Sequence, residues 1–154
     1  MNQHISKSPR VAARSLQRKI AVNVSELRTF AESAVRACLR LAKKNASNLA
    51  ALDEVSIIII SDRRMAELHQ GFMNQPGPTD VITFQHGEIF ISADTAIANA
   101  KRFGTSLRRE LRLYIVHGLL HLQGFDDRNA QSARRMRAAE RKVLNELLAL
   151  GSRV

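Results

Sequence analysis

Two histidines and two acids in the segment HGLLHLQGFDD, which begins at His117, have the types and spacing of metal ligands. His117 and His121 are four residues apart, and side chains at that spacing on a helix share one face, so both imidazoles can reach one ion. Gly124 predicts the end of the helix, beyond which Asp126 or Asp127 would contribute a carboxylate from the far side of the turn. Three protein ligands with the fourth position open are typical of a catalytic zinc site. The segment therefore predicts a metal site, with either acid as its third ligand.

The chemistry of such a site depends on what surrounds the two histidines. In a chain with five histidines, an H-x-x-x-H pair also arises by chance. A metal is favoured because the surrounding helix is very apolar, and two unpaired imidazoles would be costly there. The peptidase motif H-E-x-x-H has a glutamate base after its first histidine, whereas this chain has Gly118, which disfavours peptide hydrolysis by that route. What remains is a metal that polarises a phosphoryl oxygen, activates water, or does both.

A small set of helices and strands must position this segment. Ser106 predicts the start of the helix that carries the histidines, and the β-branched run EVSIIIIS from Glu54 predicts a strand covered on both faces. Polarity alternates over residues 17–24, which predicts a further strand. Helices are also expected from Ser25, from Ser61 or Asp62 to about Phe72, from Ser92 to about Phe103 and over residues 129–150, with a hairpin formed by residues 79–84 and 88–92. This order predicts the α+β class: a single domain in which a small mixed four-stranded sheet packs with about five helices.

Composition excludes several other classes of protein. The chain has 154 residues, 45% of them hydrophobic, and a single cysteine, so it can bury a core without a disulfide scaffold. Cys38 falls in the apolar stripe of the first predicted helix and is interpreted as a core residue. The longest apolar runs, such as residues 57–60, are far shorter than the roughly 20 residues that cross a bilayer, which predicts a soluble protein.

The positive charge is concentrated at the two ends of the chain. The formal net charge is +10 at pH 7. Residues 1–20 hold five basic residues and no acid, and residues 101–154 hold twelve basic residues against five acids. Residues 1–15 are expected to be a basic, disordered arm, and residues 16–154 the folded, metal-dependent domain. A chain this basic is suited to an acidic partner, such as nucleic acid or an anionic membrane surface.

Three motifs of the chain, in the same order, resemble those of one protein family. HGLLHLQGFDD is similar to the signature H-G-x-L-H-L-x-G-[YF]-D-H of the YbeY-type endoribonucleases, the bacterial rRNA maturation factor family. PTDVITF at residues 78–84 is similar to that family's P-T-D-V-L-S-F, and GEIFIS at residues 87–92 to its G-D-I-x-I-S. The resemblance extends more loosely from about Ile20 to Leu148, and implies a zincin-like metal helix with one Zn²⁺ per chain. It also implies a zinc-dependent, single-strand-specific endoribonuclease that processes the 3′ end of 16S rRNA and acts in ribosome quality control.

The same resemblance implies partners and site residues. The partners would be single-stranded RNA, rRNA and the small ribosomal subunit in the cytoplasm, with no membrane and no DNA. His117 and His121 match the first two metal ligands, whereas the family's third ligand is a histidine and this chain has Asp127, which replaces a neutral ligand with a charged one. The family's cleft arginine, five residues before the proline of P-T-D-V, is replaced by Met73, and methionine cannot pair with a phosphate. Pro76 stands where the family commonly has an acid.

The remaining candidate residues have weaker sequence support. His86, in the hairpin turn, is a candidate proton carrier near the metal. Six basic residues are candidate contacts for RNA phosphates: Arg63, Arg64, Lys101, Arg102, Arg134 and Arg135. The nucleophile is either water or the RNA 2′-hydroxyl. Because Met73 lacks the arginine's charge, two alternatives stay open: a ribosome-associated RNA-binding protein with a structural zinc, and another metallohydrolase that acts on a peptide or a small phosphoester.

Overall fold

The computed structural model describes residues 8–41 and 48–151 of the chain. Its elements in chain order are β1 (Arg10–Ser15), α1 (Val24–Leu39), the short 3₁₀ turn η1 (Leu49–Ala51), β2 (Glu54–Ile60), α2 (Asp62–Met73), β3 (Val81–Thr83), β4 (Glu88–Ser92), α3 (Ala93–Phe103), α4 (Leu107–Leu122) and α5 (Ala130–Gly151). This order confirms the predicted α+β class. Among the described helices, none is both long and apolar enough to cross a lipid bilayer.

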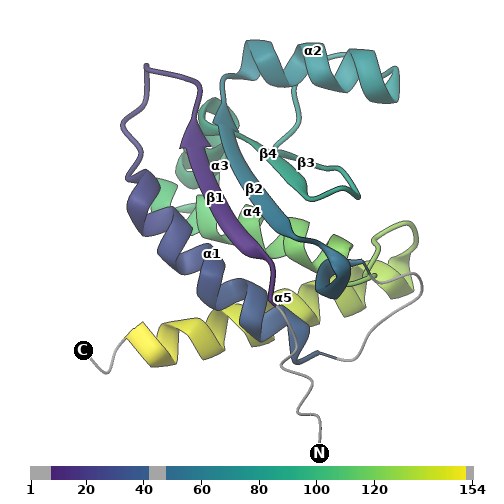
Figure 1. The fold of residues 1–154 in the computed structure, drawn as a ribbon. Coiled ribbons are helices and arrows are strands. Elements are labelled where there is room, and N and C mark those ends of the chain that lie inside the picture. The colour runs from purple at the N-terminus through teal and green to yellow at the C-terminus, as the bar shows by residue number, and fades with distance from the viewer. Residues whose placement is uncertain (1–7, 42–47, 152–154) are drawn as a thin grey trace, which may run out of the picture.

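The described strands form one mixed sheet in the order β1-β2-β4-β3 (Figure 1). β2 lies between β1 and β4 and is parallel to both, while β3 pairs antiparallel with β4 and forms an edge. The β-branched run of β2 explains its central place. Ile57 and Ile59 face one side of the sheet, Ile58 and Ile60 face the other, and all four are buried. The strand predicted at residues 54–61 is therefore confirmed.

Helices cover the two faces of the sheet unequally (Figure 1). α1, α3 and α4 pack on one face with α5 against α1 and α4, and this side holds the larger core. On the other face α2 forms a smaller core, in which Met65 packs with Ile58, Ile60 and Ile82. β3 is the edge strand beside β4. It contacts α4 on one face of the sheet, and on the other face its Ile82 packs in the smaller core that α2 forms.

Local signals at the helix ends agree with the sequence predictions. The side chains of Ser61, Ser92 and Ser106 accept hydrogen bonds from backbone N–H groups in the first turns of α2, α3 and α4. The exception is α1, which is capped by Asn23 and already includes the serine expected to cap it. Cys38 lies in the larger core, which confirms its interpretation as a core residue. Burial raises the pKa of its thiol to about 12.

The predicted strand over residues 17–24 is wrong, and so is part of the predicted disordered arm. The strand lies at Arg10–Ser15 and pairs with β2, so these residues belong to the sheet, while residues 1–7 lie outside the described part of the chain. After the strand, the Gln17 amide accepts a hydrogen bond from Ile20 N at 2.9 Å and donates one to the Ile20 carbonyl at 2.8 Å. These bonds close a turn and replace those of a strand partner, although Ile20 still packs on the core.

Candidate metal centre

The end of α4 folds back so that the predicted ligands meet. His117 and His121 lie one turn apart on α4, and Gly124 follows the helix with a φ of 97°. After this turn, the Phe125 carbonyl lies 3.1 Å from His121 Nδ1. Asp127 then approaches His117, with 3.7 Å between Asp127 Oδ2 and His117 Nε2. One ligand atom from each of His117, His121 and Asp127 lies within 4.8 Å of the other two.

Outer hydrogen bonds determine which imidazole nitrogens face the centre. His117 Nδ1 lies 2.6 Å from Glu140 Oε1, and His121 Nδ1 bonds to the Phe125 carbonyl, so in neutral rings both Nδ1 atoms carry the proton. The two Nε2 atoms then face each other with their lone pairs, 3.0 Å apart. Two lone pairs at this distance repel unless a positive charge, either a proton or a metal ion, lies between them. The histidine pair is therefore suited to hold a cation.

Two of the three separations between ligand atoms are close to those around a tetrahedral ion. Two atoms that each lie about 2.0–2.1 Å from a tetrahedral zinc are about 3.3 Å apart. The observed separations, 3.0 Å between the two Nε2 atoms and 3.7 Å from His117 Nε2 to Asp127 Oδ2, lie on either side of that value. Asp126 is engaged elsewhere, because its Oδ1 accepts a hydrogen bond from the Arg128 N–H, and the nearby Ser132 hydroxyl and this N–H lower its pKa. Of the two candidate acids, Asp127 is the one beside the histidines.

Burial and charge act differently on the two histidines. Burial opposes protonation of His117, but the hydrogen bond and charge of Glu140, together with the charge of Asp127, outweigh it and raise the pKa of His117. Burial and the neighbouring His117 lower the pKa of His121. In the pair, His117 therefore holds a proton more readily, and a metal ion that binds here must displace it.

Glu140, on α5, is a contact of the centre that the motif patterns did not indicate. It lies 23 residues after His117, and its side chain is only 14% exposed. A signal was nevertheless present in the sequence. Glu140 comes four residues after Met136 and three before Val143, both of which are buried, so it lies on the inner face of α5. An acidic residue is seldom buried without a partner, so its place on this face could have marked Glu140 as a residue with a polar contact.

Replacing Glu140 with glutamine should weaken Zn²⁺ binding about tenfold. Glutamine keeps the shape and an acceptor oxygen, but it removes the charge that makes the His117 imidazole a stronger ligand. Competition with a chelating dye measures the change in affinity. Glu146→Gln on the same helix, where Glu146 pairs with Arg40, is the matched control and should bind Zn²⁺ as the unchanged protein does. Equal affinities of the two variants would contradict a positioning role for Glu140.

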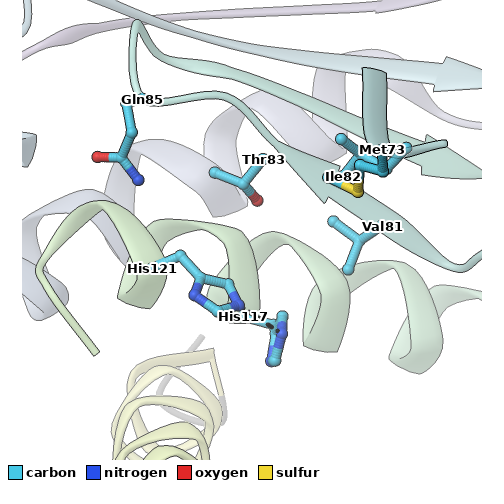
Figure 2. A pocket seen from close by; sticks show the side chains of 7 residues that line it. All are labelled: Met73, Val81, Ile82, Thr83, Gln85, His117 and His121. Atoms are coloured by element: carbon cyan, nitrogen blue, oxygen red, sulfur yellow. Dashed lines mark hydrogen bonds between the residues drawn. The ribbon is translucent and has the colours of Figure 1, made fainter. Parts of the chain in front are cut away.

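The histidines form one wall of a pocket that the hairpin closes from the other side. The lining residues are Met73, Val81, Ile82, Thr83, Gln85, His117 and His121. Figure 2 shows the Thr83 and Gln85 side chains on the hairpin side, facing the helix that carries the histidines. Thr83 Oγ1 is buried, and within the described part of the chain it has no hydrogen-bond partner. Because this oxygen is packed against Gly118, Thr83 contributes to the shape of the pocket wall.

The structure does not bring the other candidate residues into this pocket. None of the six basic candidates is among its lining residues: Arg63, Arg64, Lys101, Arg102, Arg134 and Arg135. His86 is not among them either, because its ring stacks on Phe84 and bonds to Glu88. Met73 does line the pocket, at the position where an arginine was expected from the resemblance. Over residues 8–41 and 48–151, the pocket wall therefore contains no lysine or arginine.

Gly118 lets α4 approach the hairpin closely. A Cβ atom at this position would lie 2.8 Å from Ile89 Cγ2 and 3.0 Å from Thr83 Oγ1, closer than normal contacts. Any side chain would have to displace these atoms. Packing therefore leaves no space for the glutamate that H-E-x-x-H peptidases have after their first histidine.

Gly118→Val should lower the free energy of unfolding by about 1–3 kcal/mol, because its methyl groups would overpack the contact with Ile89 and Thr83. The control is Gly71→Ala on α2, where a Cβ would meet no atom within 4 Å. That change should raise the free energy of unfolding by about 0.5–1 kcal/mol through helix propensity alone. Urea denaturation measures both. An unchanged urea midpoint for Gly118→Val would show that the hairpin can move away from α4 without a loss of stability.

Comparisons with known proteins point to one family. The family described as Endoribonuclease YbeY matches residues 13–148 of the chain. A Bacteroides thetaiotaomicron protein named Endoribonuclease YbeY is 36% identical over 100 residues, which cover 60% of this chain and 73% of the relative. An Aquifex aeolicus protein of the same name is 35% identical over 105 residues, 61% of this chain and 70% of the relative. The solution structure of a Thermotoga maritima protein shares the fold, with a TM-score of 0.63 over 92% of this chain and 91% of that chain at 24% identity. With the family match extending over most of its length, the chain belongs to the YbeY endoribonuclease family.

Proposed function

We propose that this protein is a zinc-dependent endoribonuclease that cuts single-stranded RNA. The observation that carries the proposal is the convergence of His117, His121 and Asp127 ligand atoms beside a pocket. Two imidazole nitrogens and a carboxylate oxygen are a ligand set that zinc accepts, and three protein ligands leave a coordination position for the substrate. The fit supports one Zn²⁺ per chain.

Residues of the chain itself would bind and orient the substrate. Bound zinc would supply Lewis acidity towards a phosphoryl oxygen or a water molecule. Glu140 and the Phe125 carbonyl would keep the imidazoles in the orientation that presents Nε2. Val81 and Ile82 form an apolar part of the wall and would limit the entry of water.

The choice of RNA as substrate rests on the family and on charge. The relatives carry the name endoribonuclease, and the net charge of +10 suits a polyanion. Arg134 and Arg135 are exposed on α5, the helix that also carries Glu140, and would meet phosphates that flank the cut. The pocket, about 210 Å³ in volume, has room for a phosphate group and waters. We place the reaction in the cytoplasm, in processing of the 3′ end of 16S rRNA on the small ribosomal subunit and in ribosome quality control.

Cleavage of a fluorescently labelled, unstructured RNA by the zinc-loaded protein tests the proposal. We expect the single strand to be cut, a matched duplex to survive, and cleavage to stop when EDTA removes the metal. A 2′,3′-cyclic phosphate on the product would identify the RNA 2′-hydroxyl as nucleophile, whereas a product with a 5′-phosphate and a free 3′-hydroxyl would identify water. RNA that stays intact at high protein concentration, with zinc bound, would overturn the enzymatic proposal.

One observation favours a second function, a ribosome-associated RNA-binding protein in which zinc is a structural brace. No lysine or arginine lines the pocket within the described residues, and Met73 occupies the place of the family's arginine. Tight RNA binding without cleavage by the zinc-loaded protein would select this function. Hydrolysis of a peptide or of a small phosphodiester, with RNA left intact, would instead select another metallohydrolase.

A further inference from the structure

Three aromatic rings form an array on the face of the sheet that α2 covers. Phe72, near the end of α2, meets Phe84 edge-on, with 5.1 Å between ring centroids and 73° between ring planes. Phe84 in turn stacks with His86, at 5.6 Å and 17°. A hydrogen bond between His86 Nε2 and Glu88 holds the imidazole in this orientation. The array joins two elements that are separate in the chain, the end of α2 and the hairpin turn.

The outer rings of this array are open to solvent. Phe72 is 69% exposed, and the His86 side chain is 65% exposed. Phe84, between them, is partly buried and packs on the smaller core beside Phe90. The inner ring therefore packs on the protein core, while the outer rings leave aromatic surface exposed to solvent.

The array borders the pocket through its chain neighbours. Met73 directly follows Phe72, Gln85 separates Phe84 from His86, and both Met73 and Gln85 line the pocket with the two metal-site histidines (Figure 2). Successive side chains of the hairpin point to opposite faces of the sheet, so the rings and the pocket wall lie on the two sides of one sheet edge, and an RNA strand that crosses this edge can meet both. Edge strand β3 thus has the metal centre on one face and the ring array on the other.

We propose that Phe72, Phe84 and His86 form a stacking platform for an unpaired base next to the phosphate held in the pocket. The inference rests on the proposed function in RNA cleavage. Unpaired bases stack on phenylalanine and histidine rings, and this contact accepts any base because each has a π face. A base within a duplex is already stacked and paired, so the platform selects single strands, which contacts to phosphates alone do not.

Fluorescence of 2-aminopurine tests this platform, because stacking on a ring quenches it. The probe is a 2′-O-methyl RNA hexamer with one central 2-aminopurine, which is titrated with zinc-loaded protein and checked on a gel for integrity. We expect quenching with the unchanged protein, and with Phe72→Leu a loss of quenching and about tenfold weaker binding. Phe72→Tyr should restore both. Phe103→Leu, at a phenylalanine that is 61% exposed at the end of α3, is the matched control and should behave as the unchanged protein.

A hexamer that lacks the central base separates stacking from contacts to the backbone. The unchanged protein and Phe72→Leu should bind this probe equally, and unequal binding would overturn the proposal. If Phe72→Leu binds and quenches the 2-aminopurine probe normally, the platform is wrong. That result would leave the cleavage proposal intact, whereas no RNA binding by the unchanged protein would overturn both. Because Phe72 is mostly exposed, its substitution should leave the melting temperature unchanged.

Discussion

Replacement of His121 by alanine should abolish zinc binding and lower the rate of RNA cleavage by at least roughly 10³-fold. His121 Nε2 is one of three ligand atoms that converge at the centre, 3.0 Å from His117 Nε2. Two remaining ligands would hold the ion poorly, and a metal that stabilises the transition state by several kcal/mol contributes a factor of ten for each 1.36 kcal/mol. Zinc per chain, measured by mass spectrometry of the dialysed protein, should fall to near zero.

A second histidine supplies the control for this prediction. His69, on α2, bonds through Nδ1 to the Gly77 carbonyl and is not among the lining residues of the pocket. His69→Ala should keep both zinc and cleavage. A circular dichroism melt of His121→Ala will show that the fold survives. Full zinc content in a folded His121→Ala protein would mean that the ligand assignment is wrong.

Met73→Arg should raise the rate of RNA cleavage on the order of 100-fold. Met73 lines the pocket near Ile82, across from the histidines, and is 46% exposed, so a longer side chain has room to turn towards a bound phosphate (Figure 2). Arginine binds phosphate with two parallel hydrogen bonds and stabilises the charge that develops on it. Single-turnover rates at saturating protein measure this effect on the chemical step separately from any gain in RNA affinity.

Two further substitutions at Met73 isolate the contribution of charge. Met73→Leu conserves size without charge and should leave the rate unchanged. Met73→Lys adds a charge without the planar fork of arginine, and its rate should lie between those of the leucine and arginine variants. A rate with arginine equal to that with leucine would mean that another group already supplies this charge.

The helix that carries His117 and His121 could be predicted because its signals are local. The Ser106 cap, the four-residue spacing of His117 and His121, and the stop at Gly124 all lie within one short stretch, and the structure contains each of them. The β-branched run of β2 was equally local and gave the central strand. The three ligand atoms converge because the same helix end that the glycine predicts turns Asp127 back towards His117.

Contacts between distant segments could not be predicted in this way. Glu140 reaches His117 from a different helix, and only the packing of α5 on α4 brings the two together. The alternation at residues 17–24 fits a strand as well as a turn that lays Ile20 on the core, and the Gln17 hydrogen bonds decide between them. β1 (RVAARS) contains a single β-branched residue and is a weak strand signal on its own, and it forms a strand because it pairs along the side of β2 that β4 leaves free.

The rate of RNA cleavage as a function of bound zinc tests the central claim most directly. Protein freed of metal is titrated with Zn²⁺, and occupancy and rate are measured in the same samples. If His117, His121 and Asp127 hold the catalytic ion, the rate will rise in proportion to occupancy and level off at one zinc per chain. Full cleavage by metal-free protein, or a rate that does not follow occupancy, would contradict the claim.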